Sequence, residues 1–472
     1  MSYRPYRLEI KGDLEISNFH IGTGANFSLT SDSPILRLPD GRPYLPATSL
    51  KGVLRAYLNA ETTNTPQLFG EAPDPNDNAL SRITVLDALP KSSTYAEVRD
   101  HVRIHPSWAA AYDGGKFDQE IAGETTLGFY LIYEGDSESD TELNAVREAI
   151  RALEAGDLSC GAKSGLGYGR MKLVNTRFAA FQRKEIAGLA AFLQHRIEPA
   201  KTAWQQTFPG AGQPVEPAER LWSTLECNLR IVTNGPFIVR APIPPSAAHH
   251  PFDPNKHEFY AEKGRLSADH VPVTTGPDNT VYLPGASLRG VLRHQAFRIA
   301  KTKGLDAVAK ALFGEIKDNS GVKGHIEIAD APIEGSPRYV YIDHVAIDRI
   351  TGFAADKKKF STSALESPKF NTTIRIRFKE TDLKQVALLG FLLRDLQHGR
   401  LFCGGATSRG YGHIETVTIT SVTADLAFPI PGAPLGPSPK PNRHRFEKSG
   451  AQFSDLNFLW AQAEKSWQGK EL

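Results

Sequence analysis

Several features that mark whole classes of protein are scarce in this 472-residue sequence. It has three cysteines, Cys160, Cys227 and Cys403, and none of them lies in a CxxC motif or in the cysteine–histidine spacing of a zinc site. The longest apolar run, residues 386–393, is far shorter than the roughly 20 residues that a membrane-spanning helix needs. The first residues also lack the apolar core of a secretory signal. We therefore expect no membrane segment and a location in the reducing cytoplasm.

A strong net charge is also lacking, because 55 lysines and arginines stand against 53 aspartates and glutamates, for a formal charge of +2. Any contact with nucleic acid must therefore come from a local basic surface. The content of 40% hydrophobic and 23% charged residues is that of an ordinary globular protein and argues against disorder. By length, the chain has room for about three domains, or for two large ones with additions.

An internal repeat organises the chain. Residues 44–55 read YLPATSLKGVLR and residues 282–293 read YLPGASLRGVLR, with nine of twelve positions identical at an offset of 238. The motif LFGE recurs at an offset of 244, and the later motifs recur at an offset of 243. At that offset DHV at 100–102 matches 343–345, and CGAKSGLGYGR at 160–170 matches CGGATSRGYGH at 403–413. The sequence thus predicts a first domain at 1–178, a helical linker at 179–221, a second domain at 222–425, and a Pro-rich tether with an amphipathic helix at 426–472.

Each copy has a predicted order of strand, helix, strand, strand, helix and strand, with a long hairpin-like insertion. This order is typical of a ferredoxin-like α+β domain. We expect the first helix of each copy to begin at Ser49 or Ser287 as its N-cap. The final amphipathic helix is expected to pack on its own chain, with docking to a partner subunit as the alternative.

The first helix of each copy carries a pair of cations one turn apart. Lys51 and Arg55 form the pair in copy one, and Arg289 and Arg293 form it in copy two. Cations near a helix start suit a phosphate backbone, which requires charge and no base readout. The alternative is that these are ordinary solvated residues, and recurrence in both copies favours the phosphate contact.

The glycine-rich loops before the last strand of each copy are a second candidate contact, because glycine lets backbone amides approach an anion closely. Neither loop is a Walker or dinucleotide motif. A tight structural turn remains the alternative. The residues that we expect to contact RNA in these loops are Gly165, Gly167, Arg170, Arg409 and Gly410.

The insertions, residues 102–124 and 345–366, carry apolar and aromatic side chains that suit a finger wedged between bases. The candidates at the two fingers are Trp108 and Tyr112 in copy one and Ile350 and Phe353 in copy two. A hairpin that covers its own domain is the alternative.

Motifs of nucleophilic or zinc catalysis, GxSxG and HExxH, are absent. His20 could act as a base in RNA cleavage, but copy two has no counterpart, so we assign it a structural or RNA-contacting role. Asp32 and Asp269 precede the YLP motif in both copies and could bind a divalent ion or position a 2′-hydroxyl group. A solvated loop aspartate is the alternative. The histidines at 249, 250 and 257 lie in a loop-like insertion that we interpret as solvated rather than metal-binding.

Taken together, HIGTG, the two YLP motifs, LFGE, GLGYGR, AIDRITGFAA and GYGH resemble the RAMP superfamily of CRISPR-associated proteins. The resemblance is to the backbone subunits of type III effector complexes, here fused in tandem, and the architecture is similar to that of subtype D-like systems. It covers about four fifths of the chain and leaves out the linker and the C-terminal tail.

The resemblance implies two ferredoxin-like, RRM-related domains, each with a thumb hairpin that kinks a guide–target duplex. The implied partners are guide CRISPR RNA, complementary target RNA and other type III effector subunits. It also implies that Asp32 supports metal-dependent cleavage of target RNA by 2′-hydroxyl attack, with weakly bound Mg²⁺ or another divalent ion. In copy two the equivalent residue is Asp269, with Asp253 and Asp278 as alternatives, and copy one lacks the IDRITG sequence of the thumb. A non-catalytic guide-binding subunit and a guide-processing endoribonuclease are the competing functions.

Overall fold

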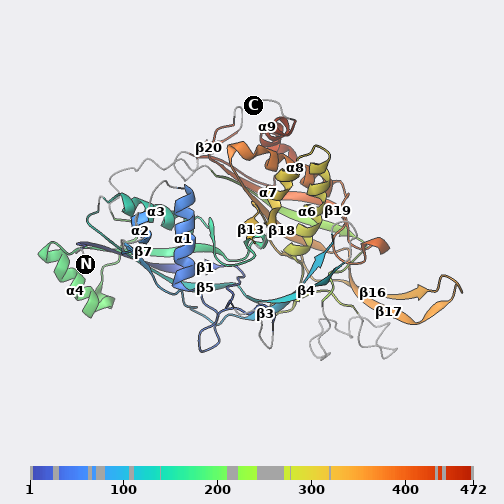
Figure 1. The fold of residues 1–472 in the computed structure, drawn as a ribbon, viewed down its shortest axis with the longest axis horizontal. Helices are drawn as coiled ribbons and strands as arrows, with labels where there is room; N and C mark the ends of the chain where they lie inside the picture. Colours follow the sequence, from blue (N-terminus) through green and yellow to red (C-terminus); the bar gives the residue numbers. More distant parts are fainter. Residues whose placement is uncertain are drawn as a thin grey trace. The chain divides into compact units, whose positions relative to one another are not determined.

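The computed structural model describes residues 4–24, 31–61, 66–70, 80–105, 111–138, 140–209, 222–241, 270–276, 278–317, 320–430, 434–437 and 443–468. The chain divides into two compact units (Figure 1). Unit 1 comprises residues 1–99 and 117–221, and unit 2 comprises residues 100–116 and 222–472.

Unit 1 is built on an antiparallel sheet with the strand order β2-β5-β1-β7-β6. Its helices α1 and α3 lie on one face of this sheet (Figure 1), where Leu8, Ile10 and Leu14 of β1 are buried. The elements of residues 1–221 in chain order are β1 (Tyr6–Ile16), α1 (Ala47–Glu61), α2 (Pro66–Phe69), β2 (Ile83–Val85), β3 (Ala96–Ile104), β4 (Ala111–Ala122), β5 (Thr125–Gly135), α3 (Thr141–Glu154), β6 (Leu158–Ser159), η1 (Ser164–Leu166), β7 (Arg170–Gln182), α4 (Ile186–Ile197) and η2 (Pro199–Lys201). Residues 100–116 of the β3–β4 hairpin belong to unit 2.

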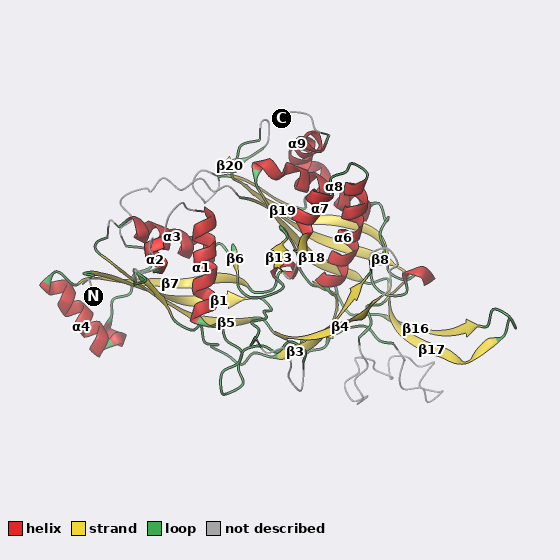
Figure 2. Ribbon diagram, viewed as in Figure 1, coloured by secondary structure: helices red, strands yellow, loops and turns green. Residues whose placement is uncertain are grey.

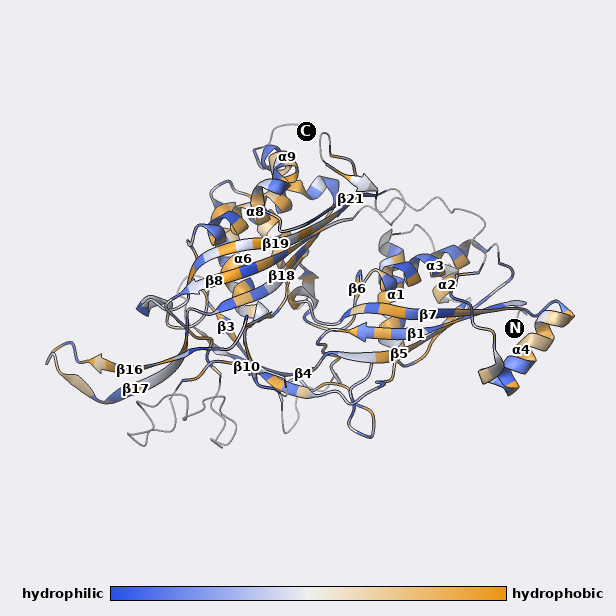
Figure 3. Cartoon of the chain, turned by 180° about the vertical axis from the view of Figure 1, so that it is seen from behind, coloured by the Kyte–Doolittle hydropathy of each residue, from blue (hydrophilic) through white to orange (hydrophobic). Residues whose placement is uncertain are grey.

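Unit 2 repeats this plan in a six-stranded sheet with the order β14-β18-β8-β19-β21-β20, and helices α6, α7 and α8 cover one face (Figure 2). Apolar and polar residues alternate along its strands, as expected for a sheet with one buried face (Figure 3). Its first elements are β8 (Ser223–Asn234), β9 (Pro236–Phe237), β10 (Thr274–Thr275), β11 (Thr280–Leu283), α6 (Gly285–Lys301), α7 (Asp306–Phe313), β12 (Gly314–Lys317), β13 (Ser320–Lys323), β14 (Ile326–Ile328) and β15 (Ala331–Pro332). The rest are β16 (Tyr339–Ile347), β17 (Ala354–Glu366), β18 (Lys369–Phe378), η5 (Glu380–Asp382), α8 (Leu383–Gln397), η6 (Thr407–Arg409), β19 (His413–Leu426), β20 (Gly436–Pro437), β21 (His444–Ser449), η7 (Phe453–Leu456) and α9 (Asn457–Trp467).

Both units therefore follow the βαββαβ order with the antiparallel strand arrangement of a ferredoxin-like domain, and the predicted α+β class is confirmed. The predicted insertion is a long hairpin in each copy, between the second and third core strands. Its strands are β3 and β4 in copy one and β16 and β17 in copy two. The strands begin at Ala96 and Tyr339, six residues before each predicted boundary, because the pairing extends down to the base of the hairpin.

The starts of α1 and α6 differ from the sequence prediction. The helices begin at Ala47 and Gly285, two residues before the serines expected as N-caps. A distant carboxylate supplies the cap, since the amide of Ala47 donates to Asp87 Oδ1 (2.7 Å) and that of Gly285 donates to Asp330 Oδ1 (2.8 Å). These contacts explain why Asp87, in the sequence LDA at 86–88, recurs as Asp330, in the sequence ADA at 329–331. In each copy this aspartate accepts a hydrogen bond from the N-terminus of the first helix.

The C-terminal segment belongs to the body of unit 2. Strand β21 pairs with β19, and α9 packs on α8 with Leu459, Trp460 and Trp467 buried. The ring of Trp460 lies so close to Gly390 of α8 that a Cβ there would approach it to 3.1 Å. The linker helix α4 instead contacts β7, while its apolar stripe, which includes Ile186 at 91% exposure, faces outward.

Candidate nucleic-acid interface

Asp32, the candidate catalytic residue of copy one, is exposed in a loop that runs beside the base of β4 in unit 1. Its backbone amide donates to Asp118 Oδ1 (2.7 Å), and the amide of Asp118 donates to Asp32 Oδ2 (3.0 Å). Each carboxylate thus accepts the backbone proton of the other residue. This reciprocal arrangement holds two negative side chains side by side at the surface.

The same loop is joined to β4 at Glu120. The amide of Glu120 donates to the carbonyl oxygen of Ser33 (3.0 Å), and Glu120 Oε2 accepts from the amide of Ile35 (2.9 Å). The other oxygen, Oε1, pairs with the guanidinium of Arg37. The loop that carries Asp32 is therefore fixed along its length.

His20 lies beneath this loop with 4% of its surface exposed. Its Nδ1 is 2.8 Å from the carbonyl oxygen of Glu120, which can only accept, so Nδ1 carries the proton and Nε2 is the acceptor. Nε2 lies 3.3 Å from Ser33 Oγ. As placed, His20 supports the loop from inside.

The register of unit 2 identifies the equivalent positions there. The bridge between Gly22 and Ile35 in unit 1 corresponds to the bridge between Arg240 and Pro272 in unit 2. Asp32 and Asp269 each precede the bridged loop residue by three positions, which makes Asp269 the counterpart by count. Asp269 and Asp253 themselves lie outside the described residues. Asp278 is exposed in the turn between β10 and β11, where it corresponds to Asp40 at an offset of 238.

The surroundings of this loop differ in unit 2. The amide of His270 donates to the carbonyl oxygen of Ser361 (3.1 Å), and the amide of Ser363 donates to that of His270 (2.9 Å). At an offset of 243, Ser361 stands where unit 1 has Asp118, and Ser363 stands where it has Glu120. Backbone hydrogen bonds join the two segments at these positions.

The paired cations of the first helices have two different environments. Arg289 donates to the carbonyl oxygens of Ile326 and Phe313 (2.8 Å each), and burial lowers the pKa of its guanidinium to about 10. Lys51 donates to Ser81 Oγ (2.8 Å), and burial, followed by the charge of Arg55, lowers its pKa. The first cation of each pair thus ties its helix to the neighbouring segment.

The second cations, Arg55 and Arg293, are exposed on their helices. The guanidinium of Arg293 lies 5.0 Å from the ring centroid of Phe297, a contact that leaves the charge at the surface. Of the four residues predicted to contact phosphate, these two are the exposed ones.

The glycine-rich loops fold as short 3₁₀ turns, η1 and η6. A Cβ at Gly169 would approach the carbonyl oxygen of Cys160 to 1.8 Å, and one at Gly412 would approach that of Cys403 to 1.9 Å, so close packing requires glycine at both. Gly167 and Gly410 end the turns with φ of 76° and 82°. The tight-turn interpretation therefore accounts for these four glycines.

Three more predicted loop residues occupy varied positions. Gly165 lies half-buried within η1. Arg170 donates from Nε to the carbonyl oxygen of Gly156 (3.1 Å). Arg409 is exposed, and its guanidinium lies 5.2 Å from the centroid of Phe360 at the base of the second hairpin.

Lys163 is a cation that sequence comparison of the two copies misses. Its Nζ lies 4.9 Å from the ring centroid of Phe117, the counterpart of Phe360, and burial lowers its pKa. Lys163 aligns with Ala406, whereas Arg409 aligns with Leu166, so each cation lacks a partner in the repeat. Only the fold shows that both units place a positive charge over equivalent phenylalanine rings.

The hairpin of copy two carries strongly exposed apolar residues at its tip. Ile350 is 95% exposed and Phe353 is 78% exposed. Asp348 holds the turn, because its Oδ1 accepts from the amides of Ile350 (3.0 Å) and Thr351 (2.8 Å). In copy one, Tyr112 is half-buried, with the guanidinium of Arg103 4.5 Å from its ring centroid, and Trp108 lies outside the described residues.

The described residues contain no group of three or more histidine, cysteine or acidic side chains that would enclose a metal ion. Mg²⁺ commonly uses one or two carboxylates and takes its other ligands from substrate phosphates and water. The exposed carboxylate of Asp32 fits such an open and weak site.

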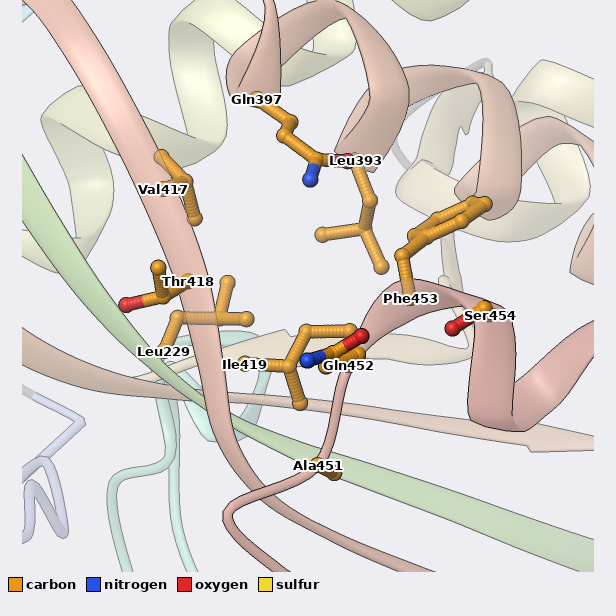
Figure 4. A pocket seen from close by; sticks show the side chains of 10 residues that line it. All are labelled: Leu229, Leu393, Gln397, Val417, Thr418, Ile419, Ala451, Gln452, Phe453 and Ser454. Atoms are coloured by element: carbon orange, nitrogen blue, oxygen red, sulfur yellow. The ribbon is translucent and has the colours of Figure 1, made fainter.

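A cavity of about 400 Å³ in unit 2 lies elsewhere, between α8, β19 and the C-terminal segment (Figure 4). Its lining is mostly apolar, with Leu229, Leu393 and Phe453 among the side chains. It contains neither a charged residue nor a residue of the predicted interface.

These observations define a class of protein: two ferredoxin-like units in tandem, each with a long hairpin inserted in its core order and a glycine-rich turn before its last core strand. Comparison with family models matches residues 14–172 and 267–415 to the RAMP superfamily, which is more than half of the chain. The chain belongs to the RAMP superfamily, and its two matching segments confirm the predicted tandem.

Two curated relatives support this assignment. The chain is 26% identical over 186 residues to the CRISPR system Cms endoribonuclease Csm3 of Methanothermobacter thermautotrophicus, covering 31% of this chain and 74% of the relative. It is also 26% identical over 231 residues to the protein of the same name from Mycobacterium tuberculosis, covering 40% of this chain and 96% of the relative. The resemblance to type III CRISPR RAMP proteins that the sequence motifs indicated is confirmed. Among the described helices, none is long and apolar enough to cross a membrane.

Proposed function

We propose that this protein is a backbone subunit of a type III CRISPR effector complex in the cytoplasm, which binds guide RNA and complementary target RNA and cleaves the target at Asp32 of unit 1. The observation that carries the proposal is the fixed, exposed carboxylate of Asp32 in a tandem RAMP protein whose relatives are named endoribonucleases.

Binding would use the exposed cations and the hairpins. Arg55 and Arg293 on the helices, with Arg409 and Lys163 at the hairpin bases, offer charge to the phosphate backbone, which gives affinity without sequence preference. Ile350 and Phe353 would wedge between bases of the guide–target duplex, because their exposed apolar side chains can separate a base step. Sequence would be read by pairing with the guide RNA.

Cleavage would proceed by attack of the target 2′-hydroxyl on the adjacent phosphorus, with departure of the 5′-oxygen and formation of a cyclic phosphate. Asp32 would orient the hydroxyl and contribute to holding Mg²⁺ together with the RNA phosphate. When bound there, Mg²⁺ would neutralise charge that develops on the phosphate. His20 is buried and its Nε2, the nitrogen that would act as a base, lies 3.3 Å from Ser33 Oγ, so we assign it a supporting role, which disfavours guide processing with His20 as the base.

The test uses the protein purified with its native partners and bound guide. Complementary RNA is added with Mg²⁺, and cuts are mapped for the wild type, Asp32→Ala and Asp40→Ala. Asp40 is the matched control, since it is an exposed loop aspartate whose carboxylate pairs with Arg42 of the same loop. We expect Asp32→Ala to remove a defined cut while target binding and the Asp40→Ala pattern stay unchanged.

An unchanged pattern in Asp32→Ala would contradict the cleavage part of the proposal. The protein would then be a non-catalytic guide-binding scaffold. For unit 2 the observation that favours such a role is the pair of serines, Ser361 and Ser363, at the positions of Asp118 and Glu120.

A further inference from the structure

The reciprocal bonds between Asp32 and Asp118 fix a side chain that would otherwise sample several rotamers. An exposed aspartate in a surface loop has no packing to select its χ1 angle. Here Oδ2 of Asp32 accepts from the amide of Asp118, while the amide of Asp32 is held by Asp118 Oδ1. The carboxylate direction of Asp32 therefore depends on the backbone amide of residue 118, and the backbone position of Asp32 depends on the side chain of Asp118.

Such fixation matters for the proposed reaction, because a displacement of about 1 Å at a reacting group can cost on the order of a hundredfold in rate. Catalytic side chains are held in place by a supporting set of hydrogen bonds. Asp118 lies on β4, a strand of the inserted hairpin, so the support comes from a regular element and not from the loop itself.

Unit 2 offers a natural comparison, since the same segments run side by side there. At an offset of 243, Ser361 occupies the position of Asp118, and its carbonyl oxygen accepts from the amide of His270, the counterpart of Ser33. A serine side chain is shorter than that of aspartate and has no carboxylate oxygen. Serine is therefore the replacement at position 118 that tests the contribution of the carboxylate.

We propose that Asp118 is a positioning residue for Asp32, whose backbone amide it holds through Oδ1. This inference rests on the proposed function. It predicts that loss of the Asp118 carboxylate oxygen slows the Asp32-dependent cut by at least about tenfold while target affinity is kept.

The experiment measures single-turnover cleavage at saturating target RNA, with target affinity determined separately, in the guide-loaded complex. Asp118→Ser places the residue of unit 2 in unit 1, and we expect at least about a tenfold loss of rate at the Asp32-dependent cut. Target affinity should stay within about twofold. Asp118→Asn keeps an oxygen that accepts from the amide of Asp32, so we expect it to retain the rate within about threefold.

Each alternative result is distinct. A wild-type rate in Asp118→Ser, or an equal loss in Asp118→Asn, overturns the positioning assignment while the proposed function stands. A rise in the half-saturating Mg²⁺ concentration in Asp118→Asn also overturns it, because it would make Asp118 a metal ligand. If Asp32→Ala leaves every cut intact, both the proposed function and this inference fail.

Discussion

Lys163 and Arg409 place a positive charge over equivalent phenylalanine rings from positions that are not equivalent in the repeat. Lys163 precedes η1, whereas Arg409 ends η6, three positions further along the same loop. Their charged groups nevertheless lie 4.9 Å and 5.2 Å from the centroids of Phe117 and Phe360. The location of the charge is kept while the residue that supplies it has changed, which favours a role for the charge itself.

Replacing these cations should weaken RNA binding through charge alone. For Lys163→Gln and Arg409→Gln we expect the slope of log affinity for RNA against log salt to fall by about one each. Lys163→Arg, which keeps the charge, should keep the slope. The matched control is Arg151→Gln, an exposed cation paired with Glu148 on α3. Salt titrations of guide RNA binding check this, and an unchanged slope in both variants would contradict a phosphate contact.

Arg289 and Arg293 lie one turn apart on α6, but their substitution should have different effects. Replacing Arg289 should lower stability, whereas replacing Arg293 should weaken RNA binding. Arg289→Ala leaves the carbonyl oxygens of Ile326 and Phe313 without their donor, and we expect a loss of about 2–4 kcal/mol in unfolding free energy. Arg293→Ala removes an exposed charge and should change stability by less than about 0.5 kcal/mol while weakening RNA binding. Denaturant unfolding and RNA retention are the two measurements. Equal effects of the two variants on unfolding free energy and on RNA retention would contradict this assignment of roles.

The tip of the second hairpin should tolerate polar substitution without loss of stability. Ile350 and Phe353 bury little surface, and Asp348 holds the turn through backbone amides, so the double serine variant should unfold within about 1 °C of the wild type. Its effect should appear in the RNA, as a lower fluorescence of a 2-aminopurine placed in the target where bases are unstacked. Val322→Ser, another exposed apolar residue of unit 2, is the control. Unchanged fluorescence would argue against a base wedge.

His344 should contribute to a fall in stability on acidification. It stacks on Phe360 at 4.8 Å between centroids, and burial, followed by the charges of Arg409 and Arg240, lowers its pKa. In the unfolded chain the imidazole takes up a proton near pH 6.5, while the folded form resists it, so this contribution is present above pH 6.5 and is lost as pH falls toward the folded pKa.

Thermal unfolding at pH 7.5 and pH 5.5 tests this contribution against His344→Asn. The variant should lose less stability between the two values than the wild type does, because it carries no proton-binding group at this position. An equal loss in both proteins would show that other groups account for the acid dependence.

Much of the architecture follows from the sequence because the repeat carries its own register. The offsets of 238 and 243 align the first helices, the hairpins and the glycine-rich turns of the two copies, and these positions correspond in the fold. Apolar and polar residues alternate along the core strands, since a sheet with one buried face imposes a period of two. The helix starts were placed two residues late because their caps, Asp87 and Asp330, come from about 40 residues further along the chain.

The candidate site divides in the same way. By itself the sequence determined the family, the two copies and the loop that holds Asp32, because these depend on the identity and order of residues. Only the tertiary structure decided that Asp118 accepts a hydrogen bond from the amide of Asp32, that Arg289 ties its helix to the neighbouring segment, and that Lys163 and Arg409 lie over equivalent rings. The physical reason is that hydrogen bonds and charge contacts depend on distance in space, and residues separated by 86 positions become neighbours only when the sheet and its hairpin have formed.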